Sequence, residues 1–220
     1  MVLESDDLVL FQGDSITDAF RKPEEVGTSY RLGAGWAMMA AAKLMAEHPE
    51  MNLRFENRGV SGNGLRHLHE RWDADTLALR PDVLSLLIGV NETYACKANG
   101  ESRPLDEFAA SYRRLLDRTR QALPGIRLIL CEPFLLEVGG IKADWLADMR
   151  ERQAVVRTVA RDFGALFVPL QEPLDQAATR TGAAHWLFDG IHPHAAGQWL
   201  IMREWLRAVG ISTTIQPEQP

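Results

Sequence analysis

The stretch VLSLLI, residues 83–88, decides the fold class of this chain, because a single serine interrupts an otherwise apolar run. A strand that buries one face alternates apolar and polar residues, whereas a nearly continuous apolar run indicates a strand covered on both faces. Such strands are typical of parallel sheets flanked by helices. The stretch therefore predicts the central strand of an α/β protein.

Further β-favouring runs and several helical patterns accompany this strand along the chain. The clearest helical pattern covers residues 105–119, where apolar side chains recur at helical spacing and charged ones occupy the opposite side. Strands that alternate with helices predict a three-layer α/β/α sandwich around a five-stranded parallel sheet. The remaining strands are expected at residues 8–11, 53–56, 128–131 and 165–168, and the remaining helices at residues 36–46, 65–79, 155–163 and 199–206.

Length and composition indicate one domain. The 220 residues, of which 46% are hydrophobic and 25% charged, suffice for one core of ordinary size. No internal repeat and no linker rich in Pro, Gly or Ser divides the sequence. We expect a single domain over residues 1–210 and a surface tail over residues 211–220, where the apolar periodicity ends.

The net charge and the cysteine content limit the expected binding partners and the expected cellular compartment. The formal net charge of −6 provides no basic field for a nucleic acid or an anionic membrane, so neither is an expected partner. Only two cysteines are present, Cys96 and Cys131, and residues 1–7 carry acids where a secretory signal carries basic residues. No apolar run approaches the roughly 20 residues of a membrane span. We therefore expect free thiols and a cytoplasmic protein, and the sequence leaves open whether it forms a homo-oligomer.

Four loops at or near the ends of predicted strands carry polar sequences with glycines. They read GDSIT at residues 13–17, NRGVSGNG at residues 57–64, GVNE at residues 89–92 and DGIHP at residues 189–193. Each sequence alone is common as a turn or a helix cap. Ligands of parallel α/β sheets bind at the carboxyl ends of the strands, where these loops would meet. Together, at one edge of the sheet, the four loops predict an active site.

The four loops resemble the sequence blocks of the SGNH hydrolases, also called the GDSL esterase and lipase superfamily. The resemblance runs from about Leu8 to about Leu206. It implies a flavodoxin-like order of the five strands and ester hydrolysis without a cofactor. Within the superfamily, residues 11–18, 57–64, 71–72, 89–92 and 189–197 resemble most closely the intracellular acetyl-xylooligosaccharide esterases, which remove acetyl groups from short xylan fragments.

The resemblance implies a catalytic triad, with Ser15 as the nucleophile, His192 as the general base and Asp189 as the residue that orients the base. A serine hydroxyl is almost never ionised at neutral pH, so it needs a neighbouring base that can accept its proton and later return it. Asp189 would accept a hydrogen bond from one ring nitrogen and leave the other nitrogen for Ser15. Because Asp189 and His192 are three positions apart, one loop can present both.

The resemblance also implies an oxyanion hole made of the backbone amides of Ser15 and Gly62 and the side chain of Asn91. Gly62 lets the backbone approach the substrate without a Cβ, and Asn91 offers two N–H donors without a charge. A helix that begins at Ser15 would add its dipole to the same field. Two positions depart from the family pattern: Ile16 replaces a leucine, and Glu92 replaces an aspartate, which puts in doubt any contact that the shorter acid makes.

Several histidines near these loops raise the alternative of a metal site. Asp189, His192 and His194 could bind a divalent metal, but no further ligand cluster is evident and the serine blocks would then have no role. His194 is better explained as the start of the last helix. His67 and His69 are two positions apart on a predicted helix, which points them to different faces and favours an exposed surface. We therefore expect no metal.

The favoured function is that of a serine esterase that acts on O-acetylated xylo-oligosaccharides or similar small acetylated carbohydrates. Trp186, Phe188 and Tyr94, close to the catalytic blocks, could form a platform for a sugar ring, with packing in the core as the alternative. One alternative function is a broad arylesterase, thioesterase or lysophospholipase of the same fold. Another is a non-catalytic flavodoxin-like binding module, although binding alone does not require a serine with an oriented base.

Overall fold

The computed structural model, which describes residues 2–213, has a five-stranded parallel sheet at its centre. The strand order is β2-β1-β3-β4-β5, the order of flavodoxin-like sheets. The strands are β1 (Leu8–Gly13), β2 (Arg54–Asn57), β3 (Val83–Leu87), β4 (Arg127–Cys131) and β5 (Leu166–Val168). Strand β3 lies in the middle and is buried along its whole length, which confirms the position predicted from its apolar run.

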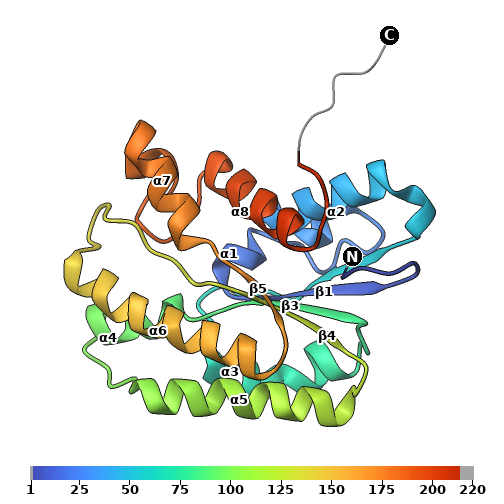
Figure 1. Cartoon of the computed structure of the whole chain (residues 1–220), viewed down its shortest axis with the longest axis horizontal. Helices are drawn as coiled ribbons and strands as arrows, with labels where there is room; N and C mark the ends of the chain where they lie inside the picture. Colours follow the sequence, from blue (N-terminus) through green and yellow to red (C-terminus); the bar gives the residue numbers. More distant parts are fainter. Residues whose placement is uncertain (1, 214–220) are drawn as a thin grey trace.

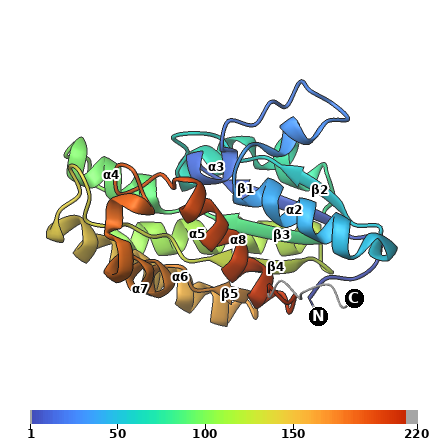
Figure 2. The same ribbon diagram turned by 90° about the horizontal axis from the view of Figure 1, so that it is seen from above.

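Helices cover both faces of the sheet and make the predicted three-layer sandwich (Figure 1). One face carries α2 (Trp36–Glu47), α7 (Gln171–Thr181) and α8 (Ala195–Ala208), and the other carries α3 (Leu65–Trp72), α5 (Leu105–Ala122) and α6 (Ala143–Asp162). Seen from above, α2 and α8 lie over the strands (Figure 2). Two shorter helices, α1 (Ser15–Asp18) and α4 (Val90–Ala98), directly follow β1 and β3.

Helices α6 and α4 are among the elements that differ from the sequence prediction, and in both of them polar residues occupy buried positions. Helix α6 begins at Ala143, well before the predicted residue 155, and it buries Arg152 and Gln153. Helix α4 was not predicted, and its buried positions include Glu92 and Thr93. Burial of polar side chains breaks the apolar periodicity on which a helix prediction depends.

Two clusters of buried side chains, one on each face of the sheet, form the core. On the α2 and α8 face, Trp36 and Trp205 pack around Phe11, whose ring lies 5.0 Å from that of Trp36. The indole nitrogen of Trp205 donates a hydrogen bond of 2.9 Å to Ser85 Oγ. This bond satisfies the hydroxyl of Ser85, the one polar residue in the central strand.

The packed part of the chain extends slightly beyond the expected domain end at residue 210. Ile211, which we expected to begin the surface tail, is buried, and its N–H donates to the carbonyl of Leu206 at 2.9 Å. Most of the expected tail, residues 214–220, lies outside the described residues.

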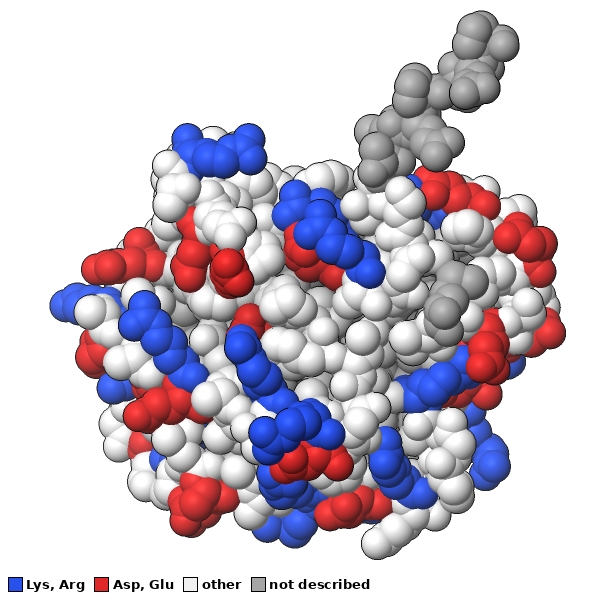
Figure 3. Space-filling model, viewed as in Figure 1, with Lys and Arg blue, Asp and Glu red and all other residues white. Residues whose placement is uncertain are grey.

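The surface carries both signs of charge. On the face shown in Figure 3, Lys and Arg side chains are interspersed with Asp and Glu rather than gathered into one basic patch. Within residues 2–213, no helix combines the length and the apolar character needed to cross a membrane.

Candidate active site

The loop after β1 places Ser15 at the carboxyl edge of the sheet. Gly13 ends the strand where the backbones are close together, because a Cβ there would lie 2.3 Å from the carbonyl oxygen of Leu87. Asp14 caps α1, and its Oδ1 accepts the N–H of Ile16 at 3.0 Å. Ser15 is the first residue of α1, a helix of only four residues. A helix this short has few aligned peptide units, so its dipole contributes less than the sequence led us to expect.

Ser15, His192 and Asp189 form one hydrogen-bonded chain. Ser15 Oγ lies 2.9 Å from His192 Nε2, and His192 Nδ1 lies 2.7 Å from Asp189 Oδ2. The second oxygen of Asp189 accepts the backbone N–H groups of Ile191 at 2.9 Å and His192 at 2.7 Å. Partial burial alone would raise the pKa of Asp189, but the backbone and ring N–H groups of His192, with that of Ile191, hold this pKa below its usual value. Asp189 is therefore a carboxylate that faces the imidazole.

The loop that carries Asp189 and His192 is anchored to the segment between β4 and α6. The N–H of Leu136 donates to the carbonyl of Gly190 at 3.0 Å. Gly190 has a φ of +89°, and a Cβ there would lie 2.5 Å from a side-chain carbon of Ile141. Only glycine adopts this conformation readily and leaves room for the contact, so the loop holds the two catalytic candidates in a fixed orientation.

The second and third blocks bring Gly62 and Asn91 to the same edge. Gly62 has a φ of +80° and no atom within 4 Å of the place that its Cβ would occupy, so the space beside its backbone is open. Asn91 is the second residue of α4, and its Nδ2 donates to the carbonyl of Asn63 at 2.8 Å. One N–H of this amide therefore fixes the side chain to the neighbouring block, and the second N–H stays available.

Comparison with known proteins identifies the family. The GDSL-like lipase/acylhydrolase family matches residues 11–200. The chain is 34% identical over 215 residues to an acetylxylan esterase of Geobacillus stearothermophilus. The alignment covers 96% of this chain and 97% of that protein. The chain belongs to the GDSL-like lipase/acylhydrolase family. The predicted family and the predicted enzyme class, a carboxylic ester hydrolase, are thereby confirmed.

Solved structures of similar proteins share the fold. The Geobacillus stearothermophilus acetylxylan esterase matches with a TM-score of 0.87 at 31% identity, covering 97% of this chain and 100% of that chain. A protein of Parabacteroides merdae assigned as a GDSL-like lipase matches with a TM-score of 0.92 at 34% identity. The match covers 96% of this chain and 98% of that chain. An α/β hydrolase enzyme from the metagenome of Lake Arreo, Spain, matches with a TM-score of 0.88 at 30% identity. The match covers 96% of this chain and 98% of that chain. The matches confirm the predicted fold class.

The three aromatic candidates of this GDSL-type hydrolase occupy different surroundings. Phe188 is 54% exposed and stacks on the ring of His192, with 5.6 Å between centroids and 17° between planes. Tyr94 is 44% exposed and makes an edge contact with Trp145. Trp186 is half-buried, packs against the core, and donates its indole N–H to Thr181 Oγ1 at 2.8 Å. The structure therefore brings Phe188 next to His192, places Tyr94 on α4 three residues after Asn91, and gives Trp186 a packing role.

Arg71, on α3, links the first and second blocks, a role that its sequence did not reveal. Its guanidinium donates to the carbonyl of Arg58 and to Asn63 Oδ1, both at 2.8 Å, and lies 3.4 Å from the carbonyl of Gly13. It also pairs with Asp75 at 2.8 Å. The resemblance included residues 71–72, but the contacts join segments far apart in the sequence, so periodicity could not predict them.

The burial of Asp14, beside Ser15, is a second feature that the sequence did not reveal. Burial raises the pKa of Asp14 to about 7, and the nearby Glu92 adds to the rise, while the N–H of Ile16 lowers it. Its Oδ2 has no hydrogen-bond partner among the described residues. Its other oxygen, Oδ1, accepts the N–H of Ile16 within the turn at 3.0 Å.

Three further histidines near the site have protein partners. His67 Nδ1 accepts the N–H of Gly64 at 3.0 Å, and His69 Nε2 lies 3.0 Å from Ser111 Oγ. His194 stands at the start of α8, as predicted, and its ring packs against Phe188. Residues 2–213 contain no group of three or more His, Cys, Asp or Glu side chains arranged to hold a metal ion.

Proposed function

We propose that this hydrolase is a serine esterase that removes acetyl groups from xylo-oligosaccharides or related small acetylated carbohydrates. The observation that carries the proposal is the chain of contacts from Ser15 Oγ to His192 Nε2 at 2.9 Å and from His192 Nδ1 to Asp189 at 2.7 Å. A serine with an oriented base serves acyl transfer and has no purpose in a binding module. We assign Ser15 as the nucleophile, His192 as the general base and Asp189 as its orienting carboxylate.

The reaction then proceeds in two halves. Ser15 Oγ attacks the acetyl carbonyl carbon while His192 Nε2 takes the hydroxyl proton, which gives a tetrahedral oxyanion. The C–O bond to the sugar breaks, His192 returns the proton to the sugar oxygen, and an acetyl-Ser15 ester remains. A water molecule attacks this ester with His192 again as the base, and acetate and free Ser15 are released. Asp189 stabilises the imidazolium in both halves.

We assign the oxyanion hole to the backbone N–H groups of Ser15 and Gly62 and to Asn91 Nδ2. The first N–H groups of a helix have no acceptor within it, so the Ser15 amide at the start of α1 is available. Neutral donors that are already in place stabilise a developing oxyanion without reorganisation during the reaction.

The choice of substrate is supported by relatives and by the site itself. The Geobacillus stearothermophilus protein is called an acetylxylan esterase and an acetyl-xylooligosaccharide esterase. Variants of that enzyme in which a serine or an aspartate is replaced by alanine are called catalytic mutants. In this chain, the exposed ring of Phe188 beside His192 offers a surface on which a sugar ring can stack.

We also propose a cytoplasmic location. The support is that Cys96 and Cys131 are both free thiols, which suits a reducing compartment.

The preference for acyl-chain length provides the test of this function. On a series of p-nitrophenyl esters, we expect kcat/KM to be highest for acetate and to fall steeply by butyrate. The reason is that, in a site shaped for acetyl, each added methylene costs about 1–3 kcal/mol. Acetate release from acetylated xylo-oligosaccharides, measured in the same preparation, tests whether the enzyme accepts a sugar as the alcohol part of the ester. Faster hydrolysis of octanoate than of acetate, with no acetate released from sugars, would favour a lipase or thioesterase instead.

A further inference from the structure

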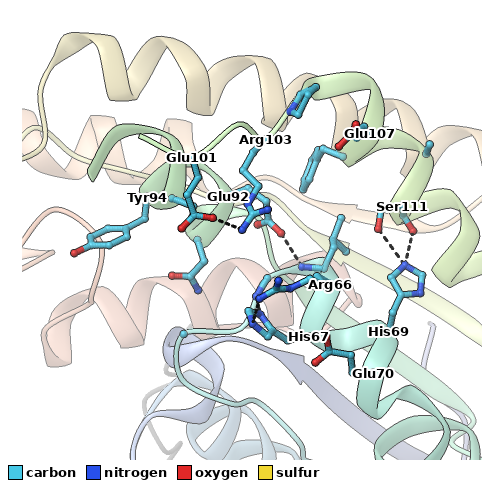
Figure 4. A pocket seen from close by; sticks show the side chains of 18 of the residues that line it. Arg66, His67, His69, Glu70, Glu92, Tyr94, Glu101, Arg103, Glu107 and Ser111 are labelled. Atoms are coloured by element: carbon cyan, nitrogen blue, oxygen red, sulfur yellow. Dashed lines mark hydrogen bonds and ion pairs between the residues drawn. The ribbon is translucent and has the colours of Figure 1, made fainter. Parts of the chain in front are cut away.

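A groove of about 920 Å³ begins beside the proposed oxyanion donors and runs between α3, α4 and α5 (Figure 4). Gly62 and Asn91 line it, so a substrate held at these donors has the groove next to it. An acetyl group has two carbons and one oxygen and occupies only a small fraction of this volume. The groove is therefore large enough for a further part of the substrate.

The side chains along the groove suit a ligand rich in hydroxyl groups. Arginines supply donors and carboxylates supply acceptors, both types occur on α3 and on the loop after α4, and a sugar hydroxyl can use both. Glu101 and Arg103 pair with each other, and Ser111 Oγ lies 3.0 Å from His69 Nε2. A sugar can add hydrogen bonds to such polar groups, whereas an acyl chain offers them none. The polar residues that matter here are Arg66 and Glu70 from α3, Glu101 and Arg103 from the loop after α4, and Glu107 and Ser111 from α5.

An aromatic ring stands at the α4 side of the groove. Tyr94 lines it, and its ring is held by an edge contact with Trp145 at 5.8 Å between centroids. Tyr94 is 44% exposed, and a ring already restrained by a neighbour can stack on a sugar at little cost in side-chain entropy. We propose that this groove binds the sugar chain that extends from the acetylated residue of the substrate. The proposal rests on the carbohydrate esterase function above.

The test compares a substrate that fills the groove with one that cannot. For Tyr94→Ala and Arg66→Ala, we expect the KM for acetylated xylotetraose to rise about tenfold more than the KM for p-nitrophenyl acetate. Loss of one stacking or charged contact produces a change of this size. Trp199→Ala is the matched aromatic control, because Trp199 is 45% exposed but lies on α8, outside the groove lining. Binding of the same oligosaccharide to Ser15→Ala, with and without Tyr94→Ala, measures affinity without turnover.

The outcomes distinguish failure of the groove assignment from failure of the proposed esterase function. Equal changes of KM for both substrates, or a change confined to the acyl-chain preference, would overturn the sugar-chain assignment while the esterase function stands. Wild-type enzyme that cleaves p-nitrophenyl acetate but releases no acetate from any acetylated sugar would overturn the carbohydrate function and the groove assignment together.

A second inference concerns Glu92, the residue that departs from the family pattern. Its side chain is 8% exposed, and its Oε1 accepts the N–H of Leu65 at 2.6 Å, the bond drawn in Figure 4. Gly64 packs directly against it, because a Cβ on Gly64 would lie 2.5 Å from the same oxygen. The Glu92 side chain on α4 therefore binds the first residue of α3 directly.

This contact fixes the spacing of the proposed oxyanion donors. Glu92 follows Asn91 on α4, and Leu65 follows the loop that carries Gly62. The Asn91 side chain makes a second tie to that loop through the carbonyl of Asn63. We infer that Glu92 is a positioning residue that keeps Gly62 and Asn91 at the separation the oxyanion requires.

Kinetics of Glu92 variants test this role. We expect Glu92→Ala to lower kcat about tenfold with little change in KM, less than the 10²- to 10³-fold loss typical of deleting a donor outright. Glu92→Gln keeps an acceptor oxygen for Leu65 and should recover most of the lost turnover. In the Asn91→Ala background, Glu92→Ala should add little, because both act on the same donors.

Two results would contradict the positioning role. One is a loss of kcat that adds in full to that of Asn91→Ala, and the other is a rise in KM alone. Should Glu92→Ala fail to fold, Gly64→Ala provides the second variant, because its φ is negative and its new Cβ displaces the carboxylate. The same pattern of lowered kcat with KM preserved is expected for it.

Discussion

Replacing Ser15 or His192 with alanine should each reduce the hydrolysis of p-nitrophenyl acetate by about 10⁴- to 10⁶-fold, and the double variant should be scarcely worse than either single one. The two groups act as a unit, because a serine without a base is a weak nucleophile and a base without the serine has no proton to take. The 2.9 Å contact between Ser15 Oγ and His192 Nε2 is the structural basis. The measurement is kcat for the three variants on the same ester.

Controls for this experiment come from the surface of the same chain. Ser5 is exposed and His48 lies at the end of α2, so Ser5→Ala and His48→Ala should keep wild-type turnover. Thermal unfolding of each variant confirms that the fold is retained. Losses for Ser15→Ala and His192→Ala that multiply in the double variant would show independent action and would remove the triad assignment.

Asn91→Ala should lower kcat by about 10²- to 10³-fold with a much smaller effect on KM. The amide is used most when negative charge develops on the carbonyl oxygen, so its loss raises the barrier more than it weakens substrate binding. The variant also removes the hydrogen bond to the carbonyl of Asn63.

Asn91→Asp separates the two roles of this side chain. It keeps the size of asparagine but replaces two N–H donors with a negative charge, so its kcat should be no higher than that of the alanine variant. A variant with normal kcat and a raised KM would instead place Asn91 in substrate binding.

The fold was predictable because its determinants lie within short stretches of sequence. The apolar run at residues 83–88 contains the central strand β3, Val83–Leu87, and the loops after the strands bring their polar residues to one edge. Strand alternation with helices and the rule that ligands bind at the carboxyl edge suffice to group Ser15, Gly62, Asn91 and His192. The family resemblance supplied the roles, which periodicity alone could not.

The remaining features depend on contacts between distant segments. Arg152 looks like a surface residue in the sequence, yet it is buried on α6, where its guanidinium bonds Asp148 at 2.9 Å and the carbonyl of Arg103 at 2.9 Å. Glu92 and Arg71 likewise find their partners only in the folded chain. A buried charged side chain is stable only when its partners surround it, and no local pattern records those partners.

The distance along the chain between Ser15 and His192 has a consequence for folding. These residues are 177 positions apart, and β1 lies between β2 and β3, so the sheet must assemble before the two side chains can meet. Contacts of high sequence separation form late, because their loop-closure entropy is lost before they contribute stability. Helical circular dichroism can recover earlier, from local contacts alone. Recovered esterase activity in a refolding reaction thus reports completion of the whole topology.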